Sequence, residues 1–100
     1  MRLVAYSSLQ DFWTANPRTE ASLRVWATVI RSGEFRTMDE IQARFPKAKV
    51  LNGERVRFEV AGGDFRLIAA IYFPAQTVWV KFVGSHAEYD RIDALTVDDY

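Results

Sequence analysis

The chain has 100 residues, of which 49% are hydrophobic and 26% are charged, and its formal net charge is zero. These values are typical of a single globular domain, and the absence of cysteine excludes a disulfide scaffold and thiolate-bound zinc. A neutral chain has no global attraction to nucleic acid or membrane, so binding of either must come from a local patch.

The first half of the chain predicts a short strand followed by helices, because apolar residues recur there at helical spacing. Proline ends the last of these helices at position 46, since the residue before a proline disfavours the helical conformation. The expected elements are a strand at 3–6, helices at 7–16, 17–32 and 37–45, and a loop or edge strand at 47–51.

Local signals mark several helix ends. Ser7 with Gln10, and Thr37 with Glu40, have the spacing of a capping box. Gly33 follows the last apolar residue of the second helix and is expected to end it in a left-handed conformation. These signals predict where the helices of the first half begin and end.

The second half of the chain predicts an antiparallel meander, around which the rest of the domain is organised. Its three runs, at 54–60, 65–73 and 77–83, alternate between apolar and other residues. Gly62-Gly63 suits a tight two-residue hairpin turn, and Pro74 suits the second position of the next turn.

The alternation predicts two different sheet faces. With Gly62-Gly63 as the turn, Glu59 lies opposite Arg66 as a cross-strand charge pair. The apolar face packs against the helices and is expected to include Val78, Val80 and Phe82. The other face is expected to carry Arg55, Arg57, Arg66, Tyr72, Trp79, Lys81 and Val83.

The end of the chain predicts one short helix and little else. Ser85 and Glu88 have capping-box spacing at the start of a helical turn over 86–92. Residues 96–100 are expected to fray. The fold class is therefore α+β, a single domain over 1–100, with an open, basic and aromatic sheet face.

Two stretches resemble a known family: GGDFRLIA at 62–69 and GSHAEYD at 84–90. They are similar to the HigB-type toxins of bacterial type II toxin–antitoxin modules, which have the RelE-like fold. The resemblance implies an N-terminal strand and helices on one face of an antiparallel meander. It also implies a small cytoplasmic endoribonuclease that cuts mRNA on the translating ribosome. A cognate helix-turn-helix antitoxin of the HigA type would hold it inactive.

The residues can be matched to the needs of metal-free RNA cleavage. The reaction needs a base for the ribose 2′-hydroxyl, cations for the phosphorane and an acid for the leaving oxygen. Arg66 is the candidate phosphate clamp and Lys81 a second cation, while His86 and Tyr89 are the candidates for proton transfer, with base and acid left open. The candidates for RNA binding are Lys47, Lys49, Arg55, Arg57, Tyr72 and Trp79.

Other interpretations of these residues stay open. Arg66 could serve only to pair with Glu59, and the basic face could belong to a non-catalytic RNA-binding module or to a protein-interaction domain. No metal-ligand cluster or phosphate-cradling glycine loop is present, so neither metal nor cofactor is expected. No apolar run approaches the ~18 residues of a membrane span, so no membrane partner is expected.

Overall fold

The computed structural model describes all residues 1–100, and its elements follow the predicted order. The expected helix over 17–32 starts as a 3-10 turn at Pro17–Thr19. None of the helices has the length and apolarity that a membrane crossing requires. The helices and strands are β1 (Arg2–Val4), α1 (Tyr6–Ala15), α2 (Glu20–Ser32), α3 (Met38–Arg44), β2 (Lys49–Val50), β3 (Arg55–Val60), β4 (Phe65–Tyr72), β5 (Thr77–Ser85) and α4 (His86–Tyr89).

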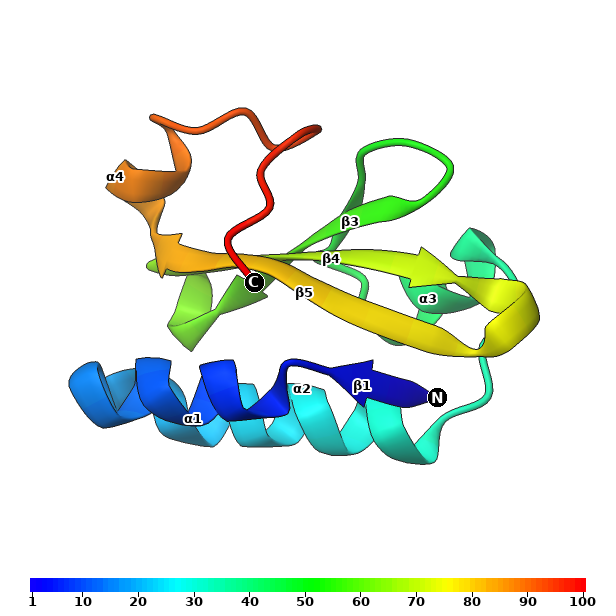
Figure 1. The fold of residues 1–100 in the computed structure, drawn as a ribbon, viewed down its shortest axis with the longest axis horizontal. Helices are drawn as coiled ribbons and strands as arrows, with labels where there is room; N and C mark the ends of the chain where they lie inside the picture. The colour runs from blue at the N-terminus through cyan, green and yellow to red at the C-terminus, as the bar shows by residue number, and fades with distance from the viewer.

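The strands form one sheet of five in the order β1-β5-β4-β3-β2 (Figure 1). The three long strands, β3, β4 and β5, make the predicted antiparallel meander. β1 pairs with β5 in parallel, and β2 pairs with β3 at the other edge. The sheet is therefore mixed, and the two short strands protect the edges of the meander.

The β3–β4 hairpin has the predicted register, with Glu59 opposite Arg66. Its connection is wider than a two-residue turn, because residues 61–64 all lie outside the strand pairing. Gly62 and Gly63 have φ angles of 70° and 95°, a left-handed conformation that glycine adopts at little steric cost. The predicted pairing is thus confirmed, while the turn that makes it is longer.

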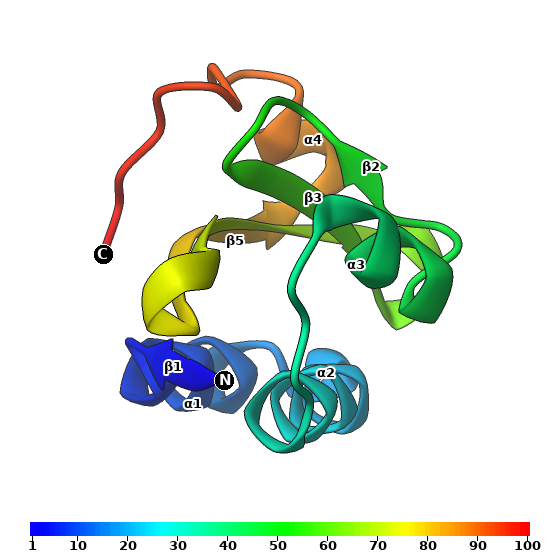
Figure 2. The same ribbon diagram turned by 90° about the vertical axis from the view of Figure 1, so that its right-hand side faces the viewer.

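α1 and α2 cover one face of the sheet, which we call the helix face; the opposite one is the outer face (Figures 1 and 2). The helix face is closed by a core of 17 buried apolar residues. At its centre the ring of Phe58 makes edge contacts with Trp26 and Phe45, at centroid distances of 5.3 Å and 5.0 Å. Trp13 and Trp26 are buried in the core, as their helical spacing predicted.

A β-bulge in β5 changes which side chains face the helices. Val80 and Phe82 pair with consecutive residues of β4, so Lys81 is an extra residue on β5. The alternation reverses at this point, and Val83 enters the core while Phe82 pairs with Ile68 on the outer face. The prediction that Phe82 faces the helices and Val83 faces away was therefore wrong.

Two predicted helix ends also differ. α1 begins after Ala5, which is left-handed and makes no side-chain cap, so the expected Ser7–Gln10 box does not form. Gly33 is extended at φ −87° rather than left-handed. A Cβ at Gly33 would lie 2.5 Å from the ring of Phe35, so close packing explains this glycine.

The outer face is covered rather than open, because α4 and residues 90–100 fold back over it (Figures 1 and 2). Asp99 donates its backbone N–H to the carbonyl of Lys81 at 2.9 Å. A Cβ at Gly84 would lie 3.3 Å from the Cβ of Glu88, so this glycine allows α4 to approach the sheet closely. The prediction that residues 96–100 fray was wrong.

Candidate active site

Arg66, the second residue of β4, lies on the outer face and is only 8% exposed, which makes it the only charged residue among the 23 that are buried. Its Nη1 donates to the carbonyls of Gly63 and Phe65 and lies 3.9 Å from the Glu59 carboxylate. Its Nε is buried without a hydrogen-bond partner. The wide 61–64 loop therefore holds one edge of the guanidinium and leaves a donor unused.

Arg57 on the neighbouring strand repeats this pattern. Its Nε is also buried and unpartnered, and its guanidinium carbon lies 6.0 Å from the centroid of the Tyr89 ring. Tyr89 in turn packs beside Phe82, with ring centroids 6.4 Å apart. Arg57 and Arg66 thus place two guanidinium groups on adjacent strands of the outer face, and guanidinium groups bind anions through paired hydrogen bonds.

His86 stands at the start of α4, directly after β5, the strand whose Gly84 pairs with Arg66. Ser85 caps the helix through the predicted capping box with Glu88, and the backbone N–H of His86 donates to the carbonyl of Asp64 at 2.9 Å. The His86 Nδ1 lies 3.1 Å from a carboxylate oxygen of Asp90. An ionised carboxylate only accepts, so in the neutral imidazole Nδ1 carries the proton there and Nε2 presents a lone pair. We call Arg57, Arg66, His86 and Tyr89 the arginine cluster.

Lys81, by contrast, lies apart from the arginine cluster. It precedes Gly84, the partner of Arg66, by three residues, which is about 10 Å along a strand. Its ammonium pairs with Asp98 at 3.0 Å. It also lines a hollow of about 330 Å³ that we call the tail-covered hollow, together with Glu54, Arg55, Ala70, Ile71, Tyr72 and Trp79. The structure thus divides the predicted site residues into two groups on one face.

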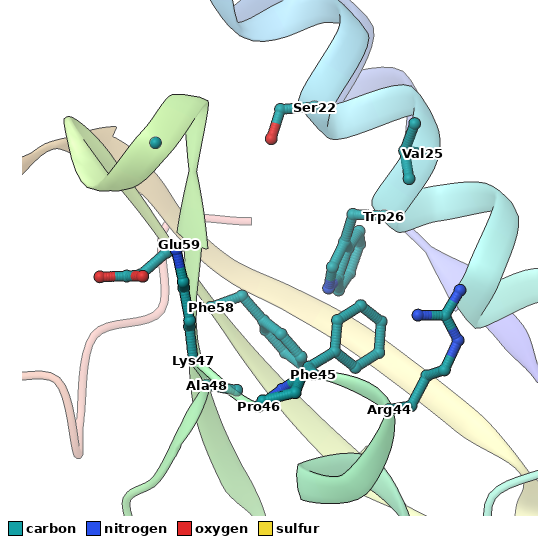
Figure 3. Close-up of a pocket in the computed structure, with 11 residues that line it drawn as sticks. Ser22, Val25, Trp26, Arg44, Phe45, Pro46, Lys47, Ala48, Phe58 and Glu59 are labelled. Atoms are coloured by element: carbon teal, nitrogen blue, oxygen red, sulfur yellow. The ribbon is translucent and has the colours of Figure 1, made fainter.

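The two remaining lysines fall on opposite sides of the sheet edge. Lys49 pairs with Arg57, so its side chain belongs to the outer face. Lys47 instead lines a groove of about 420 Å³ on the helix side, between α2, α3 and β3. Figure 3 shows Trp26 and Phe58 converging in this groove. The largest hollow of the protein is therefore an apolar groove away from the candidate acid and base.

Two residues near the site were not among the predicted site residues. Asp90 orients His86, and the i, i+4 spacing within a helical turn was the available signal. Asp98 pairs with Lys81, for which no local pattern could have been a signal because the two are 17 positions apart. No group of three or more His, Cys, Asp or Glu side chains is placed to hold a metal ion.

Tyr100, the last residue, is 45% exposed and has a phenol whose pKa is raised. Partial burial raises the pKa of its phenol above the ordinary value, and the nearby carboxylates of Asp99, Asp11 and Glu88 raise it further. Asp11 belongs to α1 and Glu88 to α4. The carboxylates that raise this pKa therefore come from elements that are far apart in the sequence.

Comparison with known proteins gives a consistent result. Residues 19–92 match the sequence model of the HigB toxin family, described as the RelE-like toxic component of a toxin–antitoxin system. The chain is 29% identical over 98 residues to the mRNA interferase toxin HigB of Escherichia coli K12, covering 95% of this chain and 93% of that one. It is equally similar to mRNA interferase HigB of Shigella flexneri. It is 28% identical over 95 residues to mRNA interferase HigB of Escherichia coli O6:H1, covering 92% of this chain and 91% of that one.

Proposed function

The chain belongs to the HigB family of RelE-like toxins of toxin–antitoxin systems, and from this premise we propose that it is an endoribonuclease that cuts mRNA during translation. A toxin of such a system has an antitoxin as its partner. We take this partner to be a helix-turn-helix protein of the HigA type, and the ribosome to be the place where the toxin meets its substrate.

The observation that supports this activity best is that the adjacent strands β3 and β4 place the guanidinium groups of Arg57 and Arg66 on the outer face. Guanidinium groups bind phosphate oxygens through parallel hydrogen bonds, and two of them can hold one phosphate from neighbouring strands. His86 and Tyr89 lie on α4, and the Tyr89 ring is 6.0 Å from the guanidinium carbon of Arg57. A phosphate placed between the arginines would therefore be next to two groups able to transfer protons.

The proposed reaction uses the ribose as its own nucleophile, without a metal ion. His86 removes the proton of the 2′-hydroxyl, and the resulting oxygen attacks phosphorus to form a 2′,3′-cyclic phosphate. The 5′-oxygen leaves and takes a proton from Tyr89. Arg66 and Arg57 stabilise the charge of the phosphorane, which is where fixed cations contribute most.

Asp90 has a supporting role in this scheme. Its carboxylate keeps the proton of the imidazole on Nδ1, so that Nε2 remains the acceptor. It also stabilises the imidazolium formed when His86 takes up a proton. This arrangement supports His86, rather than Tyr89, as the base.

Dependence on the ribosome fits the charge of the protein. The formal net charge is zero, so general attraction to RNA phosphates is weak compared with that of a basic ribonuclease. The outer face is also partly covered by the protein's own last residues. Free RNA must bind with little electrostatic help, whereas a ribosome can present the message in a fixed position.

The test is a reconstituted translation reaction in which one message is either translated or left free of ribosomes. Purified protein, released from its antitoxin, should produce new 5′ ends in the translated message and few in the free one, as mapped by primer extension. Equal cleavage of both would contradict dependence on the ribosome. Intact message in both reactions would contradict the nuclease assignment.

One observation favours a second candidate, a module that binds RNA without cutting it. Arg66 is 8% exposed and Tyr89 packs against Phe82, so both are less accessible than groups in an open site. Such a module would retain the message on the ribosome and leave its length unchanged. The same primer-extension reaction, combined with recovery of bound message, separates the two functions.

A further inference from the structure

The segment from Asp93 to Tyr100, which we call the tail, lies directly on the cationic part of the outer face (Figure 1). Its Asp98 carboxylate pairs with the Lys81 ammonium at 3.0 Å. The next residue fixes the backbone, because the N–H of Asp99 donates to the Lys81 carbonyl at 2.9 Å. One residue of β5 is thus bound twice by the tail.

Arg55, the second cation of the tail-covered hollow, also binds the tail. Arg55 Nη1 donates to the backbone carbonyls of Ala94 at 3.2 Å and Val97 at 2.7 Å. Both cations that line the hollow, Arg55 and Lys81, therefore have the tail as their partner. Carboxylate and carbonyl oxygens occupy places where RNA would offer phosphate oxygens.

The exposed fractions of the Lys81 and Asp98 side chains show which of the two lies on the solvent side. The Lys81 side chain is 19% exposed and the Asp98 side chain 61%. The tail therefore covers the lysine from the solvent side, and the Asp98 carboxylate remains exposed to solvent. An ion pair with one exposed partner is weak, because solvent screens it. Such a contact can be displaced by an RNA strand that brings several phosphates at once.

We propose that the tail is a built-in competitor for RNA, with Asp98 occupying the position of an RNA phosphate on Lys81. RNA displaces the tail, takes over Lys81 and Arg55, and enters the hollow that these two cations line together with Tyr72 and Trp79. These aromatic rings then stack on one unpaired base. The inference rests on the proposed function, because it assumes that RNA is the ligand of the outer face.

The test compares two full-length variants with the same change in charge. Asp98→Asn removes the carboxylate that pairs with Lys81, and Asp99→Asn removes the adjacent carboxylate, which has no ion pair. Binding is measured by fluorescence anisotropy with a labelled single-stranded oligonucleotide of 2′-O-methyl ribose. This probe lacks the attacking hydroxyl, so binding is observed without cleavage.

Asp98→Asn should tighten binding about two- to fivefold, as expected when a competing exposed ion pair is removed. Asp99→Asn should have a clearly smaller effect. In the Lys81→Ala background, Asp98→Asn should no longer tighten binding, because the pair is already absent. Equal effects of the two aspartates, or a gain that persists without Lys81, would overturn the inference and show only general charge repulsion.

Hydrogen exchange gives a readout that does not depend on affinity. The amide of Asp99 should be protected in the free protein and should exchange faster when the oligonucleotide is bound. Binding with unchanged protection at Asp99 would overturn the competitor role while leaving RNA binding intact. If neither the parent protein nor any variant binds the oligonucleotide, the inference fails, whereas failure of the proposed function is shown separately by intact message in the translation reaction.

Discussion

The two faces of the sheet are built on different principles. The helix face meets α1 and α2 through a core of 17 apolar residues. The outer face meets only the four-residue helix α4 and an irregular tail, and it buries Arg66 together with the unpartnered Nε of Arg57. Both faces are covered, but only one of them is covered by groups that bury apolar surface efficiently.

This contrast indicates what each face is for. Burying a charged side chain costs free energy unless its hydrogen bonds are completed, and a stable fold of this size does not require one. The arrangement at Arg57 and Arg66 is therefore poorly explained by stability. The anionic substrate proposed above would bring the opposite charge to both arginines.

The largest expected effect is on the helix face. Phe58→Ala removes the ring that contacts both Trp26 and Phe45, and should destabilise the protein by about 3–5 kcal/mol. Urea denaturation followed by circular dichroism measures this loss. The control is Tyr72→Ala on the outer face, which is 54% exposed and should change stability by less than about 0.5 kcal/mol. Similar losses for both variants would contradict the division of roles between the faces.

The next effect concerns activity on the outer face. Arg66→Ala should slow cleavage of translated message by about 10²–10³-fold, since it removes a donor to the phosphorane. It should also cost about 1–3 kcal/mol of stability, because the Gly63 carbonyl and Glu59 lose a partner.

Arg66→Lys is the matched control, because it keeps the charge but loses the planar fork. It should recover part of the stability and little of the activity. Cleavage at the parental rate by folded Arg66→Ala would rule out Arg66 as the phosphate clamp.

A smaller loss of cleavage rate is expected when His86 is replaced. This side chain is exposed, so water can take over part of its role. His86→Ala should slow cleavage by about 10²-fold, the lower end of the range for acid–base groups, without measurable loss of stability. Added imidazole should restore part of the rate, which a purely structural role would not permit. Asp90→Asn should give a smaller loss, because the histidine remains but its tautomer is no longer fixed. A normal rate for His86→Ala would transfer the role of base to Tyr89.

The sequence predicted the helix face well, because regular alternation and helical spacing carry the necessary information. The register of Glu59 with Arg66 and the burial of Trp26 followed from these periods alone. The prediction failed at Lys81, where the bulge reverses the alternation. The adjacent apolar residues Phe82 and Val83 were a sign of this irregularity, but they could not show which of them faces the core.

The outer face was predicted less well because its contacts are distant in sequence. Composition and alternation placed Arg57, Arg66 and Lys81 on this face, and the structure does so too. The covering by the tail depends on pairs such as Arg55 with Val97, which are 42 positions apart and follow no period. Long-range polar contacts of this kind leave no local pattern in a single sequence.

The smallest expected effect tests where the binding face ends. Lys49 lies on the outer face by its pairing with Arg57, whereas Lys47 lines the groove on the helix side. One phosphate contact to a single strand contributes about 0.7 to the slope of log affinity against log salt. Lys49→Ala should lower the slope measured with the 2′-O-methyl oligonucleotide by about this amount, and Lys47→Ala should leave it unchanged.

Both lysines are exposed, so neither change should alter stability by more than about 0.5 kcal/mol. If Lys47→Ala lowers the slope as much as Lys49→Ala, the RNA path continues around the β2 edge and the two faces are not separate in function.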